Sequence, residues 1–386
     1  MTPAARVAAA IEILDDILAG LGPEKALTGW GRSHRFAGSK DRAAIRDHVF
    51  GALRCRASYA WLGGAETGRG IMLGAMRSAG LVDEVFTAVG HAPAVVDTDE
   101  VVGDLVNAPR SVRLDMPEWL LPLFDEALKA EADPVLERLQ ARAGVFLRVN
   151  VAMGDAKEAI ASLADDGIVC ECVNDINTAL QVVENERRVA LSTAYENGLI
   201  ELQDTSSQVA ISELEITKGL RVLDYCAGGG GKALAMAALG AEVSAYDIDQ
   251  ARMQDITPRA KRAGVMIEVL SSEDLKNAAP FDLVLCDAPC SGSGTWRRTP
   301  AAKWDLTAER LAELNDMQDD VLQSAAPLVA QGGTLAYATC SVFECENSER
   351  VDAFLAGRPD YKLLSSRLIT PHAQGDGFFL TRMRRN

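Results

Sequence analysis

The chain has 386 residues, which is enough for about two or three domains. Its 48% hydrophobic and 24% charged residues are typical of a globular protein, and its formal net charge of −16 argues against a general nucleic-acid binder while allowing local basic surfaces. No apolar run is long enough to predict a membrane span, and acidic residues interrupt the N-terminal apolar stretch, so we expect a cytoplasmic protein without a secretory signal.

The first 125 residues or so have the apolar spacing of helices. Apolar residues recur at helical intervals from Val7 to Leu18 and again from Ile45 to Leu53. Asp115 is predicted to be the N-cap of a further short helix that carries Pro117 in its first turn. This part of the chain is therefore expected to be an all-helical domain.

Basic residues gather in three places despite the acidic total. Residues 30–56 hold seven Lys or Arg against two Asp, and the other two groups are Arg297-Arg298 with Lys303, and Arg382 with Arg384 and Arg385. Any phosphate contact is expected to come from these groups, although each one taken alone is more typical of a solvated charged face.

Two further patterns follow along the chain. Residues 145–149 and 168–173 are predicted strands that flank a helix at 155–164, which indicates a small α+β domain. From about residue 206, five predicted strands alternate with helical stretches, which is typical of a doubly wound sheet; the strands are 221–223, 242–246, 267–270, 283–285 and 334–337. A helix is expected over 311–329. The predicted domains are therefore 1–125, 126–205 and 206–386.

A glycine-rich turn follows the first of these five strands and precedes a predicted helix. It reads Cys226-Ala227-Gly228-Gly229-Gly230-Gly231-Lys232. A phosphate-binding loop would need glycine in place of Cys226 and a hydroxyl in place of Ala233, so that class of site is disfavoured. Asp247, at the end of the next strand, suits the ribose hydroxyls of either a dinucleotide or S-adenosylmethionine. The methyl donor is favoured because of two cysteines further along the chain.

Those cysteines are Cys290, in Asp287-Ala288-Pro289-Cys290, and Cys340, in Thr339-Cys340-Ser341. Each follows a predicted buried strand, at the edge where open α/β sheets place their ligands. Two thiols at one edge suit methylation of cytosine carbon 5: a thiolate adds to carbon 6, carbon 5 takes the methyl group, and loss of a proton releases the thiol. Asp287 is expected to hydrogen-bond or protonate the pyrimidine edge. These patterns leave open which thiol attacks. No Cys-x-x-Cys pair is present, so we expect no metal site.

Residues 140–386 resemble the NOL1/NOP2/Sun family of RNA cytosine-5 methyltransferases. The resemblance lies in Phe146-Leu147-Arg148-Val149-Asn150, the glycine-rich loop, the two cysteine motifs, Glu346-Asn347-Ser348 and the terminal Gly375-Asp376-Gly377-Phe378-Phe379. It implies a Rossmann-like class I methyltransferase domain in which Cys340 is the nucleophile and Cys290 the release residue. It also implies that S-adenosylmethionine is bound by Cys226, Ala227, Gly228, Gly229, Gly230, Gly231, Lys232, Asp247, Asp287 and an acid after the third strand, for which we choose Glu273 over Asp274.

The helical N-terminal part resembles the NusB-type RNA-binding domain. Together the two resemblances imply the bacterial 16S rRNA methyltransferase B type, acting as a monomer with RNA as its partner and without a membrane or a metal. The alternatives are a tRNA methyltransferase of the same family and an inactive rRNA-binding assembly factor. One departure concerns the donor loop, which usually reads Cys-Ala-x-Pro-Gly-Gly-Lys-Thr in the family. Gly229 replaces the proline and Ala233 the threonine, so we expect a looser loop with weaker donor affinity.

Overall fold

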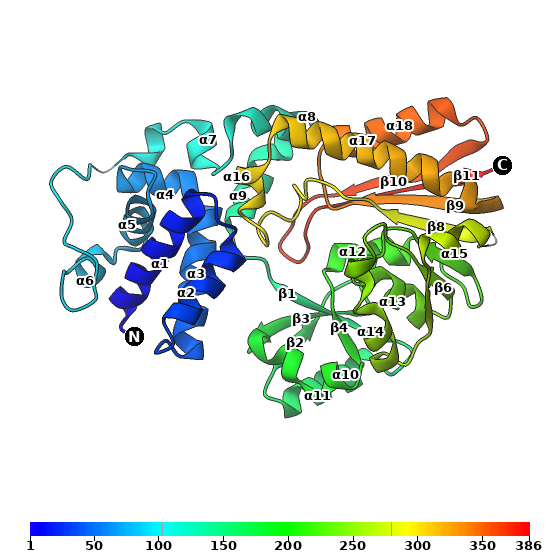
Figure 1. Cartoon of the computed structure of the whole chain (residues 1–386), viewed down its shortest axis with the longest axis horizontal. Helices are drawn as coiled ribbons and strands as arrows, with labels where there is room; N and C mark the ends of the chain where they lie inside the picture. Colours follow the sequence, from blue (N-terminus) through cyan, green and yellow to red (C-terminus); the bar gives the residue numbers. More distant parts are fainter. Residues whose placement is uncertain (102, 279) are drawn as a thin grey trace. The chain divides into compact units, whose positions relative to one another are not determined.

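The computed structural model describes residues 1–101, 103–278 and 280–386, and it divides into two compact units (Figure 1). The first unit combines Met1–Arg142 with the distant segment Trp296–Asp305, and the second combines Ala143–Thr295 with Leu306–Asn386. The segment Trp296–Asp305 therefore belongs to the N-terminal unit, although its sequence neighbours belong to the other unit. The division into three domains at 125 and 205 stays a prediction.

The first unit is helical, as the apolar spacing predicts. Its α-helices are α1 (Pro3–Leu18), α2 (Pro23–Ser33), α3 (Ser39–Arg54), α4 (Arg56–Gly63), α5 (Gly68–Ala79), α6 (Val82–Val85), α7 (Arg110–Arg113), α8 (Leu121–Leu128), α9 (Ala132–Gln140) and α16 (Ala302–Asp305). Thr2 caps α1 by accepting a hydrogen bond from Ala5 N, and Pro3 occupies the first turn. The apolar faces of α1, α3 and α5 form one buried cluster.

The predicted N-cap role of Asp115 is wrong. Asp115 has a left-handed backbone conformation (φ +50°), and its buried carboxylate accepts hydrogen bonds from Ser58 N and Ser58 Oγ, both at 2.8 Å, and from Gln140 Nε2 at 2.8 Å. Ser58, 57 residues away in sequence, binds this carboxylate. The local sequence alone predicts that the carboxylate would accept from the helix N-terminus instead.

The segment Trp296–Asp305 is anchored in the first unit through its polar side chains. Lys303 Nζ donates to Arg54 O at 2.8 Å, and Trp304 Nε1 donates to Leu53 O at 2.8 Å. Arg54 Nε in turn donates to Arg297 O at 2.6 Å. Arg297 and Lys303 are 2% and 1% exposed. The prediction that these two side chains form a surface patch for phosphates is therefore wrong.

The second unit contains the predicted small α+β fold. Four antiparallel strands in the order β2-β3-β1-β4 form a sheet, with β1 at Val145–Val149, β2 at Val169–Cys172, β3 at Ala179–Glu184 and β4 at Ile200–Leu202. Helices α10 (Ala156–Asp165) and α11 (Thr193–Glu196) accompany them. Asp155 and Glu158 form a capping box that fixes the start of α10 close to the predicted residue.

The same unit contains a seven-stranded sheet in the order β10-β11-β9-β8-β5-β6-β7. Its strands are β5 (Arg221–Asp224), β6 (Glu242–Ala245), β7 (Ile267–Val269), β8 (Phe281–Asp287), β9 (Val329–Thr339), β10 (Tyr361–Ile369) and β11 (Phe378–Arg385). Strands β5 to β9 pair in parallel, and the terminal pair β10 and β11 joins antiparallel through β11 and β9. The Rossmann-like α/β fold and the five predicted strands are confirmed. The helix expected over 311–329 is α17 (Ala308–Ala325), and Val329 already begins β9.

The C-terminal arginines lie on β11, which the sequence patterns did not predict. Arg382 Nη1 donates to Glu215 at 2.7 Å, and Arg385 Nη1 donates to Val329 O at 2.5 Å. Because the fold already engages these two side chains, Arg384 is the exposed member of this basic group.

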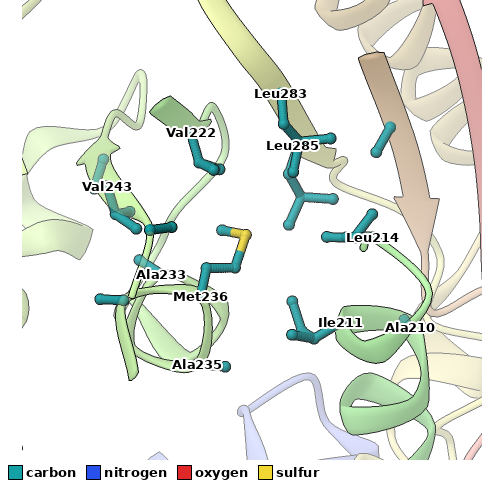
Figure 2. Close-up of a cluster of buried hydrophobic side chains, with 14 of the residues drawn as sticks. Ala210, Ile211, Leu214, Val222, Ala233, Ala235, Met236, Val243, Leu283 and Leu285 are labelled. Atoms are coloured by element: carbon teal, nitrogen blue, oxygen red, sulfur yellow. The ribbon is translucent and has the colours of Figure 1, made fainter. Parts of the chain in front are cut away.

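Helices cover both faces of the large sheet. Helices α12 (Thr205–Ser212), α13 (Gly231–Ala238) and α14 (Ile256–Arg262) pack on one face, and α17 and α18 (Ser348–Gly357) pack on the other (Figure 1). Figure 2 shows Met236 of α13 reaching between the side chains of β5, β8 and α12. This packing fixes the first turn of α13, and with it the glycine-rich loop, against the carboxyl edge of the sheet.

Candidate active site

Three adjacent parallel strands end at one edge of the large sheet. Asp224 ends β5, Asp287 ends β8, and Thr339 ends β9. The register aligns Asp224 with Leu285 and Asp287 with Ala338. The predicted convergence of the glycine-rich loop, Asp287 and both cysteines on this edge therefore occurs in the fold.

The two cysteines lie side by side. The Sγ atoms of Cys290 and Cys340 are 3.4 Å apart, and Thr295 Oγ1 lies 4.0 Å from Cys340 Sγ. The hydrogen bond with Cys290 lowers the pKa of Cys340 below its ordinary value; burial and the Asp287 carboxylate oppose this effect, and the Lys232 ammonium supports it. The same hydrogen bond and burial hold the pKa of Cys290 well above its ordinary value. One thiol is thus disposed to ionise while the other keeps its proton.

A buried carboxylate ties the two cysteine loops together. Glu346 is 0% exposed, and its Oε1 accepts hydrogen bonds from Ser291 N at 2.8 Å and Gln318 Nε2 at 3.1 Å. Its Oε2 accepts from Ser291 Oγ at 2.5 Å and from Ser341 Oγ. Since Ser291 and Ser341 directly follow the two cysteines, this carboxylate sets how far apart the thiols stand.

The glycine-rich loop has the backbone conformation that its composition predicts. Gly228 and Gly230 have φ of +49° and +79°, and Gly230 N donates to Ala227 O at 2.8 Å to close a tight turn. Helix α13 begins at the next residue, so its free N–H groups point out of this turn. Asp247 is 1% exposed, and its Oδ2 accepts from Gly228 N at 2.9 Å.

Charged groups of both signs lie beside the loop, where Arg252 pairs with Asp247 at 3.2 Å and Arg259 contacts Gly229. Lys232 Nζ and Asp287 Oδ2 form an ion pair of 2.6 Å; burial lowers the pKa of Lys232, but the Asp287 carboxylate more than offsets this and raises it overall. Both carboxylate oxygens of Asp224 are buried, neither has a hydrogen-bond partner within residues 1–101, 103–278 and 280–386, and burial raises the pKa of Asp224 to about 7. A buried acid without a partner beside a helix N-terminus suits a polar ligand that carries positive charge, as S-adenosylmethionine does.

The remaining predicted loop residues have different surroundings. Cys226 is half-buried, and burial raises the pKa of its thiol well above the ordinary value, which indicates an unreactive side chain. Glu273 lies in the first turn of α15 (Ser272–Asn277), is 79% exposed, and forms an ion pair of 3.3 Å with Lys276. Asp274 accepts hydrogen bonds from Ser271 N and Oγ in a capping box. Glu273 is thus the less constrained acid, and its contact with the donor stays a prediction.

Two residues of this edge were not singled out as site residues from the sequence. Asp224 is the last residue of β5, and Asp247 lies two residues after the end of β6. This similar position at the carboxyl end of a strand could have identified Asp224 as a site residue. Glu346 belongs to the motif Glu346-Asn347-Ser348, but its role was not predicted, because its partners come from three separate segments of the chain. Among residues 1–101, 103–278 and 280–386, no group of His, Cys, Asp and Glu could hold a metal ion. The same residues form no helix long and apolar enough to cross a membrane.

Comparisons with known proteins extend over nearly the whole chain. The family model described as 16S rRNA methyltransferase RsmB/F matches residues 211–384, and the model of the RsmF/B-like ferredoxin-like domain matches residues 116–189. Ribosomal RNA small subunit methyltransferase B of Klebsiella pneumoniae subsp. pneumoniae is 30% identical, with 90% of this chain and 91% of that protein covered.

Solved structures share the fold. The crystal structure of PH0851 covers 100% of this chain and 99% of its own, with a TM-score of 0.76 at 23% identity. NSun6 from Pyrococcus horikoshii, solved with SFG, covers 70% of this chain and 98% of its own, with a TM-score of 0.61 at 18% identity.

Proposed function

Because this chain belongs to the RsmB/F family of 16S rRNA methyltransferases, we propose that it methylates carbon 5 of a cytosine in 16S rRNA through a covalent bond between Cys340 and carbon 6 of the base. The chain is an RNA methyltransferase that uses S-adenosylmethionine. The proposal adds the atom that is methylated, the covalent route and the residues that carry it.

The observation that carries the proposal is the distance of 3.4 Å between the sulfur atoms of Cys290 and Cys340. Methyl transfer to an oxygen or an amine needs no such pair. Carbon 5 of cytosine is a poor nucleophile, and it needs a thiol that adds to carbon 6 and later leaves. At this edge of the sheet, the pKa of Cys340 is lowered and that of Cys290 is raised. Such a pair suits a reaction in which one thiol attacks carbon 6 and the other assists its release.

In the proposed first step, the Cys340 thiolate forms a bond to carbon 6 of a cytosine that has left its base stack. Lys232 and the Cys290 hydrogen bond stabilise that thiolate before the attack. Asp287, at the end of β8, hydrogen-bonds the pyrimidine edge, and Glu346 keeps both cysteine loops in register. After carbon 5 is methylated, Cys290 loses its own proton to water and takes the proton of carbon 5, and the electron pair of the bond between Cys340 and carbon 6 returns to the Cys340 sulfur as that bond breaks. Cys290 assists this release, because it is the thiol adjacent to the leaving sulfur.

The donor would be held by the glycine-rich loop from Cys226 to Lys232, together with Asp247, Asp287 and Glu273. The buried oxygens of Asp224 and the free N–H groups of α13 support this placement. When bound, S-adenosylmethionine supplies the methyl group and the electrophilic carbon that carbon 5 attacks. The chain's own contribution is to orient that carbon and to exclude water from it.

We further propose that the first unit is NusB-like and binds the RNA backbone in the cytoplasm. The exposed side chains of Arg32, Arg35 and Lys40 supply positive charge, and Phe36, which lies among them, is 73% exposed. Arg46 is a weaker candidate, because Glu24 already forms an ion pair with it. Such contacts would position the RNA without selecting its sequence.

An inactive rRNA-binding factor is disfavoured because it would not need a buried carboxylate that holds two thiol loops together. A tRNA substrate is an alternative within the same chemistry. Bisulfite sequencing of total RNA from a deletion strain separates these cases. Loss of one methylated cytosine in 16S rRNA, restored by the wild-type chain and not by C340A, is the expected result. Loss of a tRNA site instead, or of no site, would refute the proposed substrate.

A further inference from the structure

The glycine-rich loop is held from outside by an arginine that its own sequence motif does not contain. Arg259, in the last turn of α14, donates a hydrogen bond from Nη1 to the carbonyl oxygen of Gly229. Gly229 occupies one of the two central positions of the turn that Gly230 N and Ala227 O close. The guanidinium therefore contacts the most exposed peptide of the turn.

A buried carboxylate fixes this guanidinium. Glu201 of β4 is 3% exposed, and its Oε2 lies 2.9 Å from Arg259 Nη2. Its Oε1 accepts a hydrogen bond from Arg262 Nη2, one turn further along α14. Arg262 also stacks on Tyr195, with 4.0 Å between its guanidinium carbon and the ring centre. Glu201 thus holds two arginines, of which Arg259 is the one that reaches the loop.

The space beside Gly229 is narrow. A Cβ atom at position 229 would lie 3.2 Å from Arg259 Nη1, closer than an ordinary van der Waals contact. A side chain at 229 and the guanidinium of Arg259 therefore compete for the same space. The related loops that carry proline at this position restrict their backbone covalently. Here the restriction comes from a charge-assisted hydrogen bond.

We propose that Arg259, anchored by Glu201, is a positioning residue that holds the donor loop in its binding conformation in place of a loop proline. This inference rests on the proposed donor site. Its consequence is that a glycine at 229 carries no penalty in donor affinity as long as the ion pair between Arg259 and Glu201 is intact. The small α+β sheet, which supplies Glu201, then takes part in donor binding without touching the donor.

The test measures S-adenosylmethionine binding to the full chain by calorimetry. R259A should weaken binding about tenfold, the effect of losing one charge-assisted hydrogen bond. R262A is the matched control, because it removes the other partner of Glu201 and leaves the loop contact in place. Its donor affinity should stay within about twofold of wild type. In steady-state assays, R259A should raise KM for the donor and leave KM for RNA unchanged.

The decisive variant adds the proline. G229P alone should weaken donor binding, because the ring crowds Arg259, whereas G229P in the R259A background should restore affinity toward wild type. Equal effects of R259A and R262A, or a double variant no better than R259A, would overturn the inference. D247A separates this outcome from a failure of the donor site itself. If D247A weakens binding while R259A does not, only the role of Arg259 is lost; if D247A has no effect, the donor site lies elsewhere.

Discussion

Replacement of Glu346 tests how the two thiols are held in position. In E346A, the Ser291 N–H loses its buried acceptor and the Gln318 amide keeps Pro289 O but loses its other acceptor, and each such loss costs about 1–3 kcal/mol. The stability of the second unit should therefore fall by about 2–6 kcal/mol. The cysteine loops would separate, and a displacement of about 1 Å at a reacting group costs about 100-fold in rate. We expect a loss of at least that size in single-turnover methylation.

The matched variant is E346Q. Its carbonyl oxygen can accept from Ser291 N and Gln318 Nε2, and its amide can donate to the hydroxyls of Ser291 and Ser341, so most activity should return. The negative charge of Glu346 contributes to the raised pKa of Cys290. In E346Q the pKa of Cys290 should fall, which alkylation of this thiol against pH measures in a C340A background. A Gln variant as inactive as E346A, or an alkylation profile that does not move, would refute the positioning role.

Three further predictions address the donor, the buried lysine and the RNA. D247A should weaken S-adenosylmethionine binding by about 1–3 kcal/mol in calorimetry, because a buried partner of the loop is lost, and unchanged affinity would contradict this. Burial lowers the pKa of Lys303 from 10.5 to about 8, so its charge destabilises the fold below pH 8 and this penalty disappears as the pH rises to 10.5. Relative to K303M, the wild-type chain should gain about 3 kcal/mol over that range, and a constant difference would contradict the burial argument. R32E combined with R35E should weaken RNA binding and reduce the slope of log K against log salt by about 1.4, the value for two phosphates of a single strand; an unchanged slope would make these side chains a solvated face.

The Lys303 measurement has a convenient probe. All five tryptophans, at positions 30, 61, 119, 296 and 304, belong to the first unit. Tryptophan fluorescence during urea unfolding therefore reports this unit alone. The second unit needs a different signal, such as hydrogen exchange of the parallel strands.

The sequence predicted those features that depend on local patterns. The five parallel strands are short apolar runs, and the carboxyl edges of such strands lie together in any doubly wound sheet. This geometry alone predicts that Cys290 and Cys340 lie at one edge of the sheet. The contact between the two cysteine loops involves Glu346, whose partners are up to 55 residues away in sequence.

The features that the sequence did not predict depend on long-range contacts or on weak patterns. The exposed strand β10 carries half-exposed Leu363 and Leu364 side by side, so it lacks the alternation that identifies a strand. The burial of Lys303 depends on Arg54, which is 249 residues away. The local sequence around Lys303 does not distinguish a lysine that contacts phosphate from one that donates to a buried carbonyl oxygen.

Trapping of the covalent protein–RNA adduct tests the central proposal most directly. C290A should form the bond between Cys340 and carbon 6, methylate the base and then fail to release it. A protein–RNA species should accumulate and survive denaturing electrophoresis, whereas C340A should give none. An adduct in C340A and none in C290A would mean that the two thiols have exchanged roles. Activity without any adduct in either variant would contradict the covalent route.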